Sequence, residues 1–387
     1  MTTAIEVHGV CDSRFRAVKD AFAENFPTYG EVGAAVAVTV DGQPVVDLWA
    51  GHADAARTRA WERDTIVNVY STTKGMTAIC AHRLVDQGRL DLDAPVAKYW
   101  PEFAQAGKDE LPVPYLLSHR AGLPAVSELL PAGSLYKWDV MTAALAKQEP
   151  WWEPGTKHGY HALTFGWLVG EVIRRASGRS VGAYFREEIA EPLGLDFHIG
   201  LAPEHDPRTA EMIPAPLPQP GEPNLLAEIL ANPMGLRAFV PSPDMMDPSR
   251  VNTREWRAAE IPSANGHGDA RSLARVYGAL ARGGELDGVR VLSQAAIDQA
   301  IVEQSSGIDA VLTLPIRFGL GFILTMPDAP IGPNPRTFGH AGMGGSLGFA
   351  DPDAKVGFGY AMNKMIATPD LIDPRWPSMI DAIYASL

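Results

Sequence analysis

The sequence lacks several features that would assign it to a special class of protein. No uninterrupted apolar run comes near the roughly 18 residues that a membrane-spanning helix needs, so neither a membrane span nor a membrane partner is expected. Residues 1–8 contain neither the basic segment nor the apolar core of a secretory signal. The sequence therefore predicts a cytoplasmic protein.

Basic residues and cysteines are also few. The chain has 33 Lys+Arg against 46 Asp+Glu, a formal net charge of −13, and no Lys/Arg-rich run. Because phosphate backbones repel such a chain, nucleic acid is not expected as a partner. Cys11 and Cys80 are too few for a disulfide framework or a thiolate zinc site. Both are expected to be reduced, with Cys80 buried on a helix.

Motifs for phosphate, dinucleotide and metal binding are missing. The chain has no Walker P-loop, no G-x-G-x-x-G, no H-E-x-x-H and no EF-hand loop. His158 and His161 lie three positions apart, but no carboxylate accompanies them at ligand spacing, and zinc needs three or four organised ligands. No cofactor and no metal are therefore expected.

What is present is an ordinary globular composition with strand signals at both ends. The 387 residues are 46% apolar and 20% charged, enough for two domains or one large one. Near the N-terminus, apolar runs flank Asp41-Gly42, the strongest short-range signal for a β-hairpin. The predicted strands cover residues 34–40, 44–49, 66–70, 318–325, 337–342, 346–350 and 355–363.

Helical periodicity dominates the middle of the chain. The predicted helices cover residues 12–27, 71–87, 138–147, 162–176, 181–190 and 269–282, with a last one inside 370–387. Because repeated strand–helix–strand units are absent, a doubly wound parallel sheet is not expected. We predict one α/β domain with an antiparallel sheet, built from residues 1–70 and 265–387, and a mostly helical domain over 71–264.

One segment of the helical domain differs in composition. Residues 202–248 hold 11 of the 32 prolines. Proline removes backbone donors and interrupts helices, so this segment is predicted to be a long irregular excursion. Loops of that length are usually functional, and we expect it to form a wall or lid of the substrate pocket.

Two serine motifs compete for the role of nucleophile. Residues 344–348, Gly-Gly-Ser-Leu-Gly, match the G-x-S-x-G elbow of α/β-hydrolases. That elbow needs a following helix and a later histidine, but strand patterns follow Ser346 and no histidine lies beyond position 340. We therefore interpret this motif as a tight bend between strands.

The second motif, S-x-x-K, occurs at Ser71–Lys74 and again at Ser134–Lys137, where Ser134 is predicted to be a helix cap. Ser71 lies where a strand-like run meets an amphipathic helix, and one helical turn brings the Lys74 amine near its hydroxyl. A helix N-terminus favours an oxyanion there, and burial would lower the pKa of Lys74. The alternative is that Ser71 only caps the helix and Lys74 is a solvated charge.

Further stretches bring a family resemblance. Together with Tyr70-Ser71-Thr72-Thr73-Lys74, they resemble the serine β-lactamase and penicillin-binding protein superfamily, with the family VIII carboxylesterases as the nearest branch. The resemblance covers most of the chain, from about 34 to 363. The other stretches, in chain order, are 117–123, 152–155 with Tyr160-His161, 192–195, 263–266 and 339–342.

This resemblance implies a fold and a set of roles. The fold is α+β and β-lactamase/transpeptidase-like, with an antiparallel sheet flanked by helices plus an all-helical lobe. Ser71 would be the nucleophile, Lys74 its activating partner, and Tyr160 the co-base and proton shuttle. Residues 339–342 take the place of the family's Lys-Thr-Gly strand, so His340 and Gly342 would face the substrate. The amides of Met343 and Ser71 would bind the oxyanion.

Two departures from the family pattern bear on the substrate. Ala162 stands where class C β-lactamases have the asparagine of Tyr-x-Asn, and His340 replaces the lysine of Lys-Thr-Gly. Both changes remove groups that recognise a β-lactam or a peptide carboxylate. A histidine at the second place also occurs in some DD-peptidases, so His340 alone does not exclude them.

The sequence thus predicts a serine carboxylesterase for small esters of short to medium acyl chain, able to transfer the acyl group to alcohols. Its predicted partner is a small-molecule ester. The alternatives are a β-lactamase or DD-peptidase-like amide hydrolase, and a non-catalytic binding relative. Trp152, Phe239 and Trp256 are candidates for the acyl pocket, with ordinary core packing as the alternative. Lys74 and Tyr160 are expected to titrate together, with a nearby cation lowering the pKa of the tyrosine.

Overall fold

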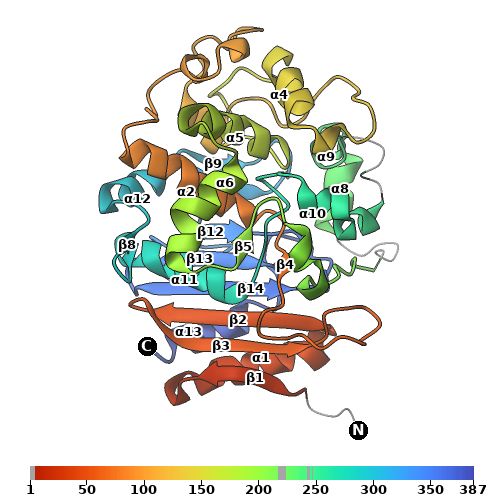
Figure 1. Cartoon of the computed structure of the whole chain (residues 1–387), viewed down its shortest axis with the longest axis vertical. Coiled ribbons are helices and arrows are strands. Elements are labelled where there is room, and N and C mark those ends of the chain that lie inside the picture. The colour runs from red at the N-terminus through yellow and green to blue at the C-terminus, as the bar shows by residue number, and fades with distance from the viewer. Residues whose placement is uncertain (1–4, 217–223, 242–244, 246) are drawn as a thin grey trace.

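The structure is a computed structural model, and it describes residues 5–216, 224–241, 245 and 247–387. Its main element is a nine-stranded antiparallel sheet whose strands come from both ends of the chain (Figure 1). This confirms the expected sheet. In spatial order the strands are β1 (Val7–Cys11), β3 (Gln43–Gly51), β2 (Gly33–Val40), β14 (Val356–Met362), β13 (Leu347–Asp351), β12 (Phe338–Ala341), β11 (Ile323–Leu324), β10 (Pro315–Phe318) and β9 (Ser305–Ile308).

The hairpin of β2 and β3 forms where the sequence predicts it. Its turn residues, Asp41 and Gly42, both have positive φ angles, 47° and 78°. Such a turn has the twist of its flanking strands, which is why Asp-Gly is so frequent there. Strand β1 was not predicted, because five exposed or half-buried residues give no alternating apolar pattern.

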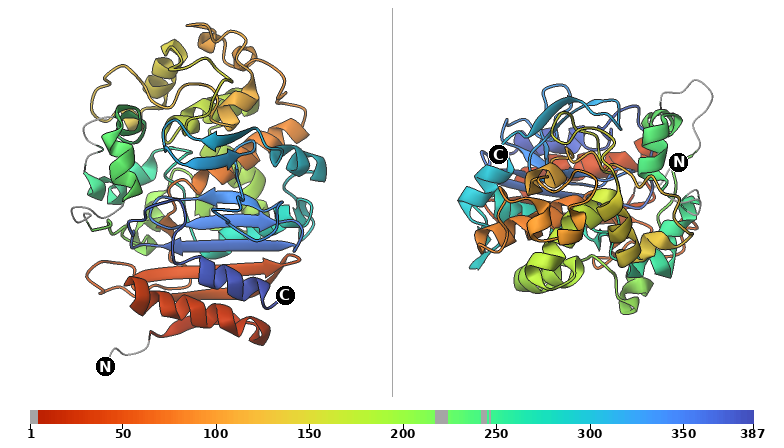
Figure 2. Two further views of the ribbon diagram at one scale, coloured as in Figure 1. Left: turned by 180° about the vertical axis from the view of Figure 1, so that it is seen from behind. Right: turned by 90° about the horizontal axis from the view of Figure 1, so that it is seen from above.

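Helices cover both faces of this sheet. Helices α1 (Arg16–Tyr29) and α13 (Pro377–Tyr384) pack together on one face, and α11 (Ala270–Ala281) lies on the other (Figures 1 and 2). Helix α11 lies close against β14, where a Cβ at Gly357 would meet the backbone of Gly278. The bare backbones let this helix contact the sheet directly.

The middle of the chain is helical, as expected, and α2 is its central element, buried along nearly its whole length. A π-helical stretch, Arg186–Ala190, joins two of the shorter helices. The helices are α2 (Thr73–Asp86), α3 (Val113–Leu117), α4 (Trp138–Lys147), α5 (Thr164–Ser177), α6 (Val181–Phe185), α7 (Glu191–Leu193), α8 (Leu225–Ala231), α9 (Pro233–Phe239), α10 (Arg254–Ala258) and α12 (Gln294–Ala300).

The proline-rich segment is more ordered than its composition suggests. The expectation of an irregular excursion over 202–248 is wrong in part, because the segment holds the 3-10 helix Pro203–Arg208 and helices α8 and α9. Asn224 and Asn232 cap these two helices, and Pro233 occupies the first helical position, where its missing N–H costs nothing. Residues 217–223, 242–244 and 246 of this segment lie outside the described residues.

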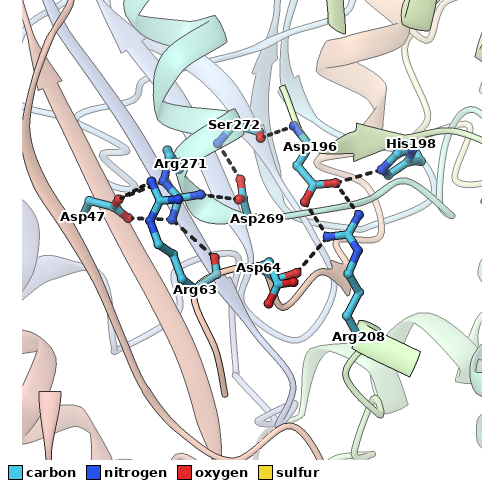
Figure 3. Close-up of polar contacts among 9 residues, drawn as sticks. All are labelled: Asp47, Arg63, Asp64, Asp196, His198, Arg208, Asp269, Arg271 and Ser272. Carbon is cyan, nitrogen blue, oxygen red and sulfur yellow. Dashed lines mark hydrogen bonds and ion pairs between the residues drawn. The ribbon is translucent and has the colours of Figure 1, made fainter. Parts of the chain in front are cut away.

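A small sheet connects the helical part to α11. Strands β4 (Val67–Asn68), β6 (His267–Gly268) and β5 (Phe197–His198) form it, and β7 (Glu285–Leu286) pairs with β8 (Val289–Arg290) separately. Beside it, Asp196 accepts from Arg208 and His198, and its amide donates to Ser272 Oγ at 2.8 Å (Figure 3). Asp269 caps α11, since its side chain accepts from the amide of Ser272.

The charged groups beside this cap reach the main sheet. Arg271 pairs with Asp269 at 2.8 Å and with Asp47 of β3 at 2.8 Å (Figure 3). Both cysteines are free, Cys80 being buried on α2 and Cys11 half-buried on β1. Within the described ranges, every helix is too short or too polar to cross a membrane.

Candidate active site

Ser71 lies in the tight connection between β4 and α2. The preceding residue, Tyr70, has a φ of 43°, a left-handed conformation that turns the chain from strand direction into the helix. The Ser71 carbonyl accepts from the Lys74 amide at 2.9 Å, but α2 begins at Thr73 with Thr72 as its N-cap, two residues later than the predicted start at Ser71. The following residues, Thr72, Thr73 and Lys74, are fully buried, whereas Ser71 is half-buried.

The Lys74 amine is the most unusual group of the site. Its Nζ lies 3.2 Å from Ser71 Oγ, 2.7 Å from the Ala162 carbonyl and 2.9 Å from the Ser263 carbonyl. Among the described residues, no carboxylate forms an ion pair with it, and its burial lowers the pKa well below that of an ordinary lysine. Lys74 is therefore not the solvated charge that the alternative interpretation required.

Burial disfavours the charged form of the Lys74 amine, although the three surrounding oxygens would also accept from an ammonium. In the neutral form, two N–H groups donate to the carbonyls of Ala162 and Ser263, and the lone pair faces the Ser71 hydroxyl. The arrangement can therefore accept the serine proton.

Tyr160 reaches the same serine from the loop between α4 and α5. Its ring centroid lies 4.7 Å from Lys74 Nζ, and its hydroxyl interacts with Ser71. Burial raises the pKa of Tyr160, an effect that the hydrogen bond with Ser71 only partly offsets. The expected lowering of the tyrosine pKa by a cation is therefore corrected. Burial favours the protonated phenol beside the neutral amine.

His340 is placed on strand β12, beside Tyr160, at a distance of 6.3 Å between ring centroids. Burial and the nearby Lys74 lower the pKa of His340 to about 3, so the ring is neutral near pH 7. Its Nδ1 donates to the Ala341 carbonyl at 2.7 Å, while its buried Nε2 has no partner among the described residues. A neutral ring does not reproduce the charge of a lysine at this place.

The turn after β12 packs directly against the serine connection. Gly342 has no room for a side chain, because a Cβ would meet Ser346 Oγ and the Val69 carbonyl. Ser346 is buried and donates to the Val69 carbonyl at 2.8 Å, so the Thr72 hydroxyl donates to Ser346 at 3.0 Å. Ser346 thus forms part of a bend between strands, as the sequence interpretation holds, and fixes that bend beside Ser71.

The amides of Ser71 and Met343 are the two predicted oxyanion donors. Within the described residues, neither amide has a hydrogen-bond acceptor, although the neighbouring amides of Thr72 and Gly342 do. Met343 is 36% exposed, whereas Gly342 is half-buried. Two free N–H groups beside a serine hydroxyl are the arrangement that binds the oxygen of a tetrahedral intermediate.

Three buried groups hold the Tyr160 loop, and sequence reasoning gave none of them this role. Asp309 Oδ1 accepts from the Tyr160 amide at 3.0 Å, His119 Nδ1 from the His161 amide at 3.0 Å, and His161 Nε2 from the Leu123 amide at 3.0 Å. Burial lowers the pKa of both histidines. Asp309 is 149 positions from Tyr160, and no local pattern indicates that contact.

The three aromatic pocket candidates lie in different surroundings. Phe239 packs in an apolar cluster with Tyr160, at 6.4 Å between ring centroids. Trp152 belongs to the loop that carries Tyr160 and packs against His161. Trp256 lies in the main core and donates to Asn68 at 3.1 Å, so it is not brought to the Tyr160 cluster, and core packing describes it better. The cluster consists of Ala125, Tyr160, Ala162, Leu225, Ile229, Ala238, Val311, Leu312, Ile316 and Phe318 with partly buried Trp151, Met234, Phe239, Leu314, Ile323 and Leu371.

No group of three or more His, Cys, Asp or Glu side chains within the described ranges is arranged to hold a metal ion. His158 instead faces Asp309, at 3.9 Å between Nε2 and Oδ2. The groups that the structure brings to the Ser71 hydroxyl are the Lys74 amine and the Tyr160 phenol.

Comparisons with known proteins cover nearly the whole chain. The family model described as Beta-lactamase matches residues 18–376. The chain is 40% identical over 368 residues to the Esterase/beta-lactamase LipL of Mycobacterium tuberculosis, covering 93% of this chain and 84% of that protein. It is similar to the crystal structure of a family VIII carboxylesterase, with 45% identity and a TM-score of 0.91 over 99% of this chain and 100% of that one. A penicillin-binding protein homologue from Caulobacter crescentus is 43% identical, with a TM-score of 0.90 over the same shares.

Proposed function

The chain belongs to the beta-lactamase family, and from that premise we propose that it is a serine carboxylesterase acting through an acyl-enzyme on Ser71. The observation that carries this proposal is the buried Lys74 amine, which lies 3.2 Å from Ser71 Oγ, is held by two carbonyls and has no counter-ion in the described part of the chain. A base of this kind is available near neutral pH, because its charged form is disfavoured.

The reaction proceeds by acyl transfer in two halves. The Ser71 proton passes to the Lys74 amine as Oγ attacks the ester carbonyl, and the amides of Ser71 and Met343 bind the oxyanion. Tyr160, protonated because burial raises its pKa, gives its proton to the leaving alkoxide and is reprotonated from Lys74. Water or an acceptor alcohol then attacks the acyl-enzyme by the reverse route.

The surroundings of the serine favour esters over β-lactams. Ala162 offers only a carbonyl, to Lys74, and His340 is neutral near pH 7, so neither holds the amide or the carboxylate of a lactam. The apolar cluster beside Tyr160 suits a short to medium acyl chain. Leu225 and Ile229 of α8 and Phe239 of α9 pack in this cluster, which supports the proposal that this part of the proline-rich segment lines the acyl site.

The similarity to an esterase/beta-lactamase keeps lactam hydrolysis as the second candidate activity. We expect kcat/KM for p-nitrophenyl butyrate to exceed that for a chromogenic cephalosporin, because His340 supplies no cation. Equal or higher values for the cephalosporin would reverse the order of the two proposals. Turnover of neither substrate would favour a binding protein.

Replacing the serines tests the nucleophile directly. Ser71→Ala should abolish turnover of p-nitrophenyl butyrate, because among the described residues only the Ser71 hydroxyl is hydrogen-bonded to Lys74 Nζ. Ser134→Ala is the matched control, since Ser134 begins the second S-x-x-K and lies in the 3-10 helix Ser134–Tyr136. The Ser346→Ala variant should keep most of the wild-type turnover of p-nitrophenyl butyrate. An active Ser71→Ala enzyme would exclude the proposed nucleophile.

A further inference from the structure

The turn that carries the Met343 amide has little stiffness of its own. It contains Gly342, Gly344 and Gly345, and the last two have φ angles of 86° and 126°. Because glycine has no Cβ, it adopts positive and negative φ angles about equally well, so these residues restrain the turn only weakly. An oxyanion donor is effective only when it is already in position, because reorienting it during the reaction costs free energy. The turn has two hydrogen bonds of its own, from the Gly342 amide to the Ser346 carbonyl at 2.8 Å and from the Gly345 amide to the Gly342 carbonyl at 3.1 Å, and Ser346 donates to the Val69 carbonyl. These bonds leave the Gly344 and Gly345 carbonyls free, so contacts from outside the turn are needed to fix that part of it.

Two side chains just before α13 make those contacts. Arg375 Nη2 donates to the Gly344 carbonyl, and Trp376 Nε1 donates to the Gly345 carbonyl at 2.7 Å. The guanidinium lies so close that a Cβ at Gly345 would collide with it. These carbonyls belong to the Gly344–Gly345 and Gly345–Ser346 peptide units, in the same turn as the Gly342–Met343 unit that carries the amide, so the two contacts restrain the half of the turn that follows Met343.

Arg375 is itself held in a buried ionic cluster. It is completely buried, and its guanidinium pairs with Glu31 at 2.9 Å and with Asp373 at 2.7 Å. Tyr360 donates to the second oxygen of Glu31, and Arg375 Nη1 also donates to the Lys364 carbonyl at 2.9 Å. The members come from β14, from the chain that follows β14, and from the connection before β2.

Such a cluster is a poor source of stability. Removing charges from water costs about as much as their mutual attraction returns, and an apolar set of similar volume is often no less stable. What the cluster supplies is a fixed direction, because every donor of the Arg375 guanidinium has a partner.

We propose that Arg375 and Trp376 are positioning residues for catalysis, which hold the Gly344 and Gly345 carbonyls so that the Met343 amide stays in place for the oxyanion. This inference rests on the proposed function, in which Met343 binds the oxyanion of the Ser71 adduct. It leads to a specific kinetic signature. Loosening the turn removes stabilisation that exists mainly in the transition state, so kcat falls while KM changes little.

The test uses Trp376→Phe, which keeps an aromatic ring and removes one N–H donor. The matched control is Trp138→Phe, which also removes one indole hydrogen bond, to Glu171 at 2.7 Å, but on α4 in the helical part. Arg375→Lys is the second variant, because it keeps the charge and loses the planar fork. Thermal melting establishes that each variant is folded, and active-site titration normalises kcat.

Each variant is assayed with p-nitrophenyl butyrate and with its thiono analogue, in which sulfur replaces the carbonyl oxygen. Sulfur is a weak acceptor, so the thiono ester gains little from oxyanion donors. We expect Trp376→Phe to lower kcat for the oxygen ester about tenfold, less than the 10²–10³ for deleting an oxyanion donor, and to lower the oxygen-to-thiono ratio. KM should stay within about twofold, and Trp138→Phe should match the wild type.

Three results would overturn the inference: a wild-type kcat in Trp376→Phe and Arg375→Lys, a lower kcat with an unchanged oxygen-to-thiono ratio, or an effect on KM alone. The proposed function fails separately, if Ser71→Ala stays active. An inactive Ser71→Ala with a wild-type ratio in Trp376→Phe rejects only the positioning role.

Discussion

Two buried basic side chains, Lys74 and Arg375, have opposite surroundings. Among the described residues, the Lys74 amine contacts only neutral groups, two carbonyls and a hydroxyl, and burial lowers its pKa. Arg375 has the same burial, but the neighbouring Tyr360, Glu31 and Asp373 more than offset its effect and raise the pKa. Burial without a counter-ion makes a base, and burial with counter-ions makes a permanently charged support.

A third basic side chain, Arg271, lies in a partly exposed environment. Arg271 also pairs with two carboxylates, of Asp47 and Asp269, but its side chain is 30% exposed (Figure 3). Water screens such pairs, and their loss costs little. Comparing Lys74, Arg375 and Arg271 therefore separates the effect of burial on the charge of a basic side chain from the effect of neighbouring carboxylates.

The largest effect is expected from removing the base. Lys74→Ala and Tyr160→Phe should each lower kcat by about 10²–10⁴, the range for losing a positioned acid–base group. Because the two groups pass one proton between Ser71 and the leaving group, the double variant should be little worse than the worse single one. The measurement is a double-mutant cycle on kcat/KM with one ester.

Lys137→Ala, in the second S-x-x-K, is the matched control and should leave kcat/KM unchanged. Losses that simply multiply in the double variant would mean that Lys74 and Tyr160 act independently, and the shared-proton route would be wrong.

The second effect concerns folding. Arg375→Met leaves Glu31 and Asp373 buried without a cation, and should lower the free energy of unfolding by about 3–5 kcal/mol. Lys74→Met should cost less than half as much, because it leaves only neutral carbonyls behind and removes a desolvated amine. Arg271→Met should cost about 1 kcal/mol or less. Urea denaturation measures the free energy of unfolding of the three variants. Equal losses in Arg375→Met and Lys74→Met would contradict the distinction between these two buried side chains.

A smaller effect is the pH dependence of stability. When pH falls below the ordinary lysine pKa of about 10.4, the unfolded chain binds a proton at Lys74 that the folded chain does not. The wild type therefore loses stability progressively as pH falls toward the lowered pKa, whereas Lys74→Met has nothing to titrate there. As pH falls from about 10 to about 7, the Tm of Lys74→Met should therefore rise relative to that of the wild type. A constant difference would mean that Lys74 stays charged when folded.

The smallest effect is expected at the apolar cluster. Phe239→Ala should shift the preferred acyl length toward longer esters by roughly tenfold in relative kcat/KM, as expected for one altered hydrophobic contact. Leu236→Ala, on the same helix but 39% exposed, is the control. An unchanged chain-length profile in Phe239→Ala would place the acyl pocket elsewhere.

The sequence predicts what depends on neighbours in the chain. One helical turn brings Lys74 to Ser71, Asp-Gly sets the β2–β3 hairpin, and the missing histidine excludes Ser346 from the elbow mechanism. The capped helices α8 and α9 were missed, because proline content hid the asparagine and proline signals of two helix starts.

Contacts between segments that are distant in the sequence could not be predicted from it. Arg375 follows Gly344 by 31 positions and precedes a helix, and an isolated arginine between Pro374 and Trp376 is typical of an exposed loop. Only the folded sheet places it under the turn. Likewise, the aromatic character of Trp256 fits a pocket or a core, and only the packing distinguishes them.

The most direct test of the central claim is covalent labelling. The protein is treated with a serine-reactive phosphonate, and its intact mass and peptide map are measured beside those of Lys74→Ala. We expect one adduct per chain, on the peptide that contains Ser71, formed much more slowly when Lys74 is replaced, because its amine takes the serine proton. An adduct on Ser346 or Ser134, or equal labelling rates for wild type and Lys74→Ala, would contradict the assignment of Ser71 and Lys74 as nucleophile and base.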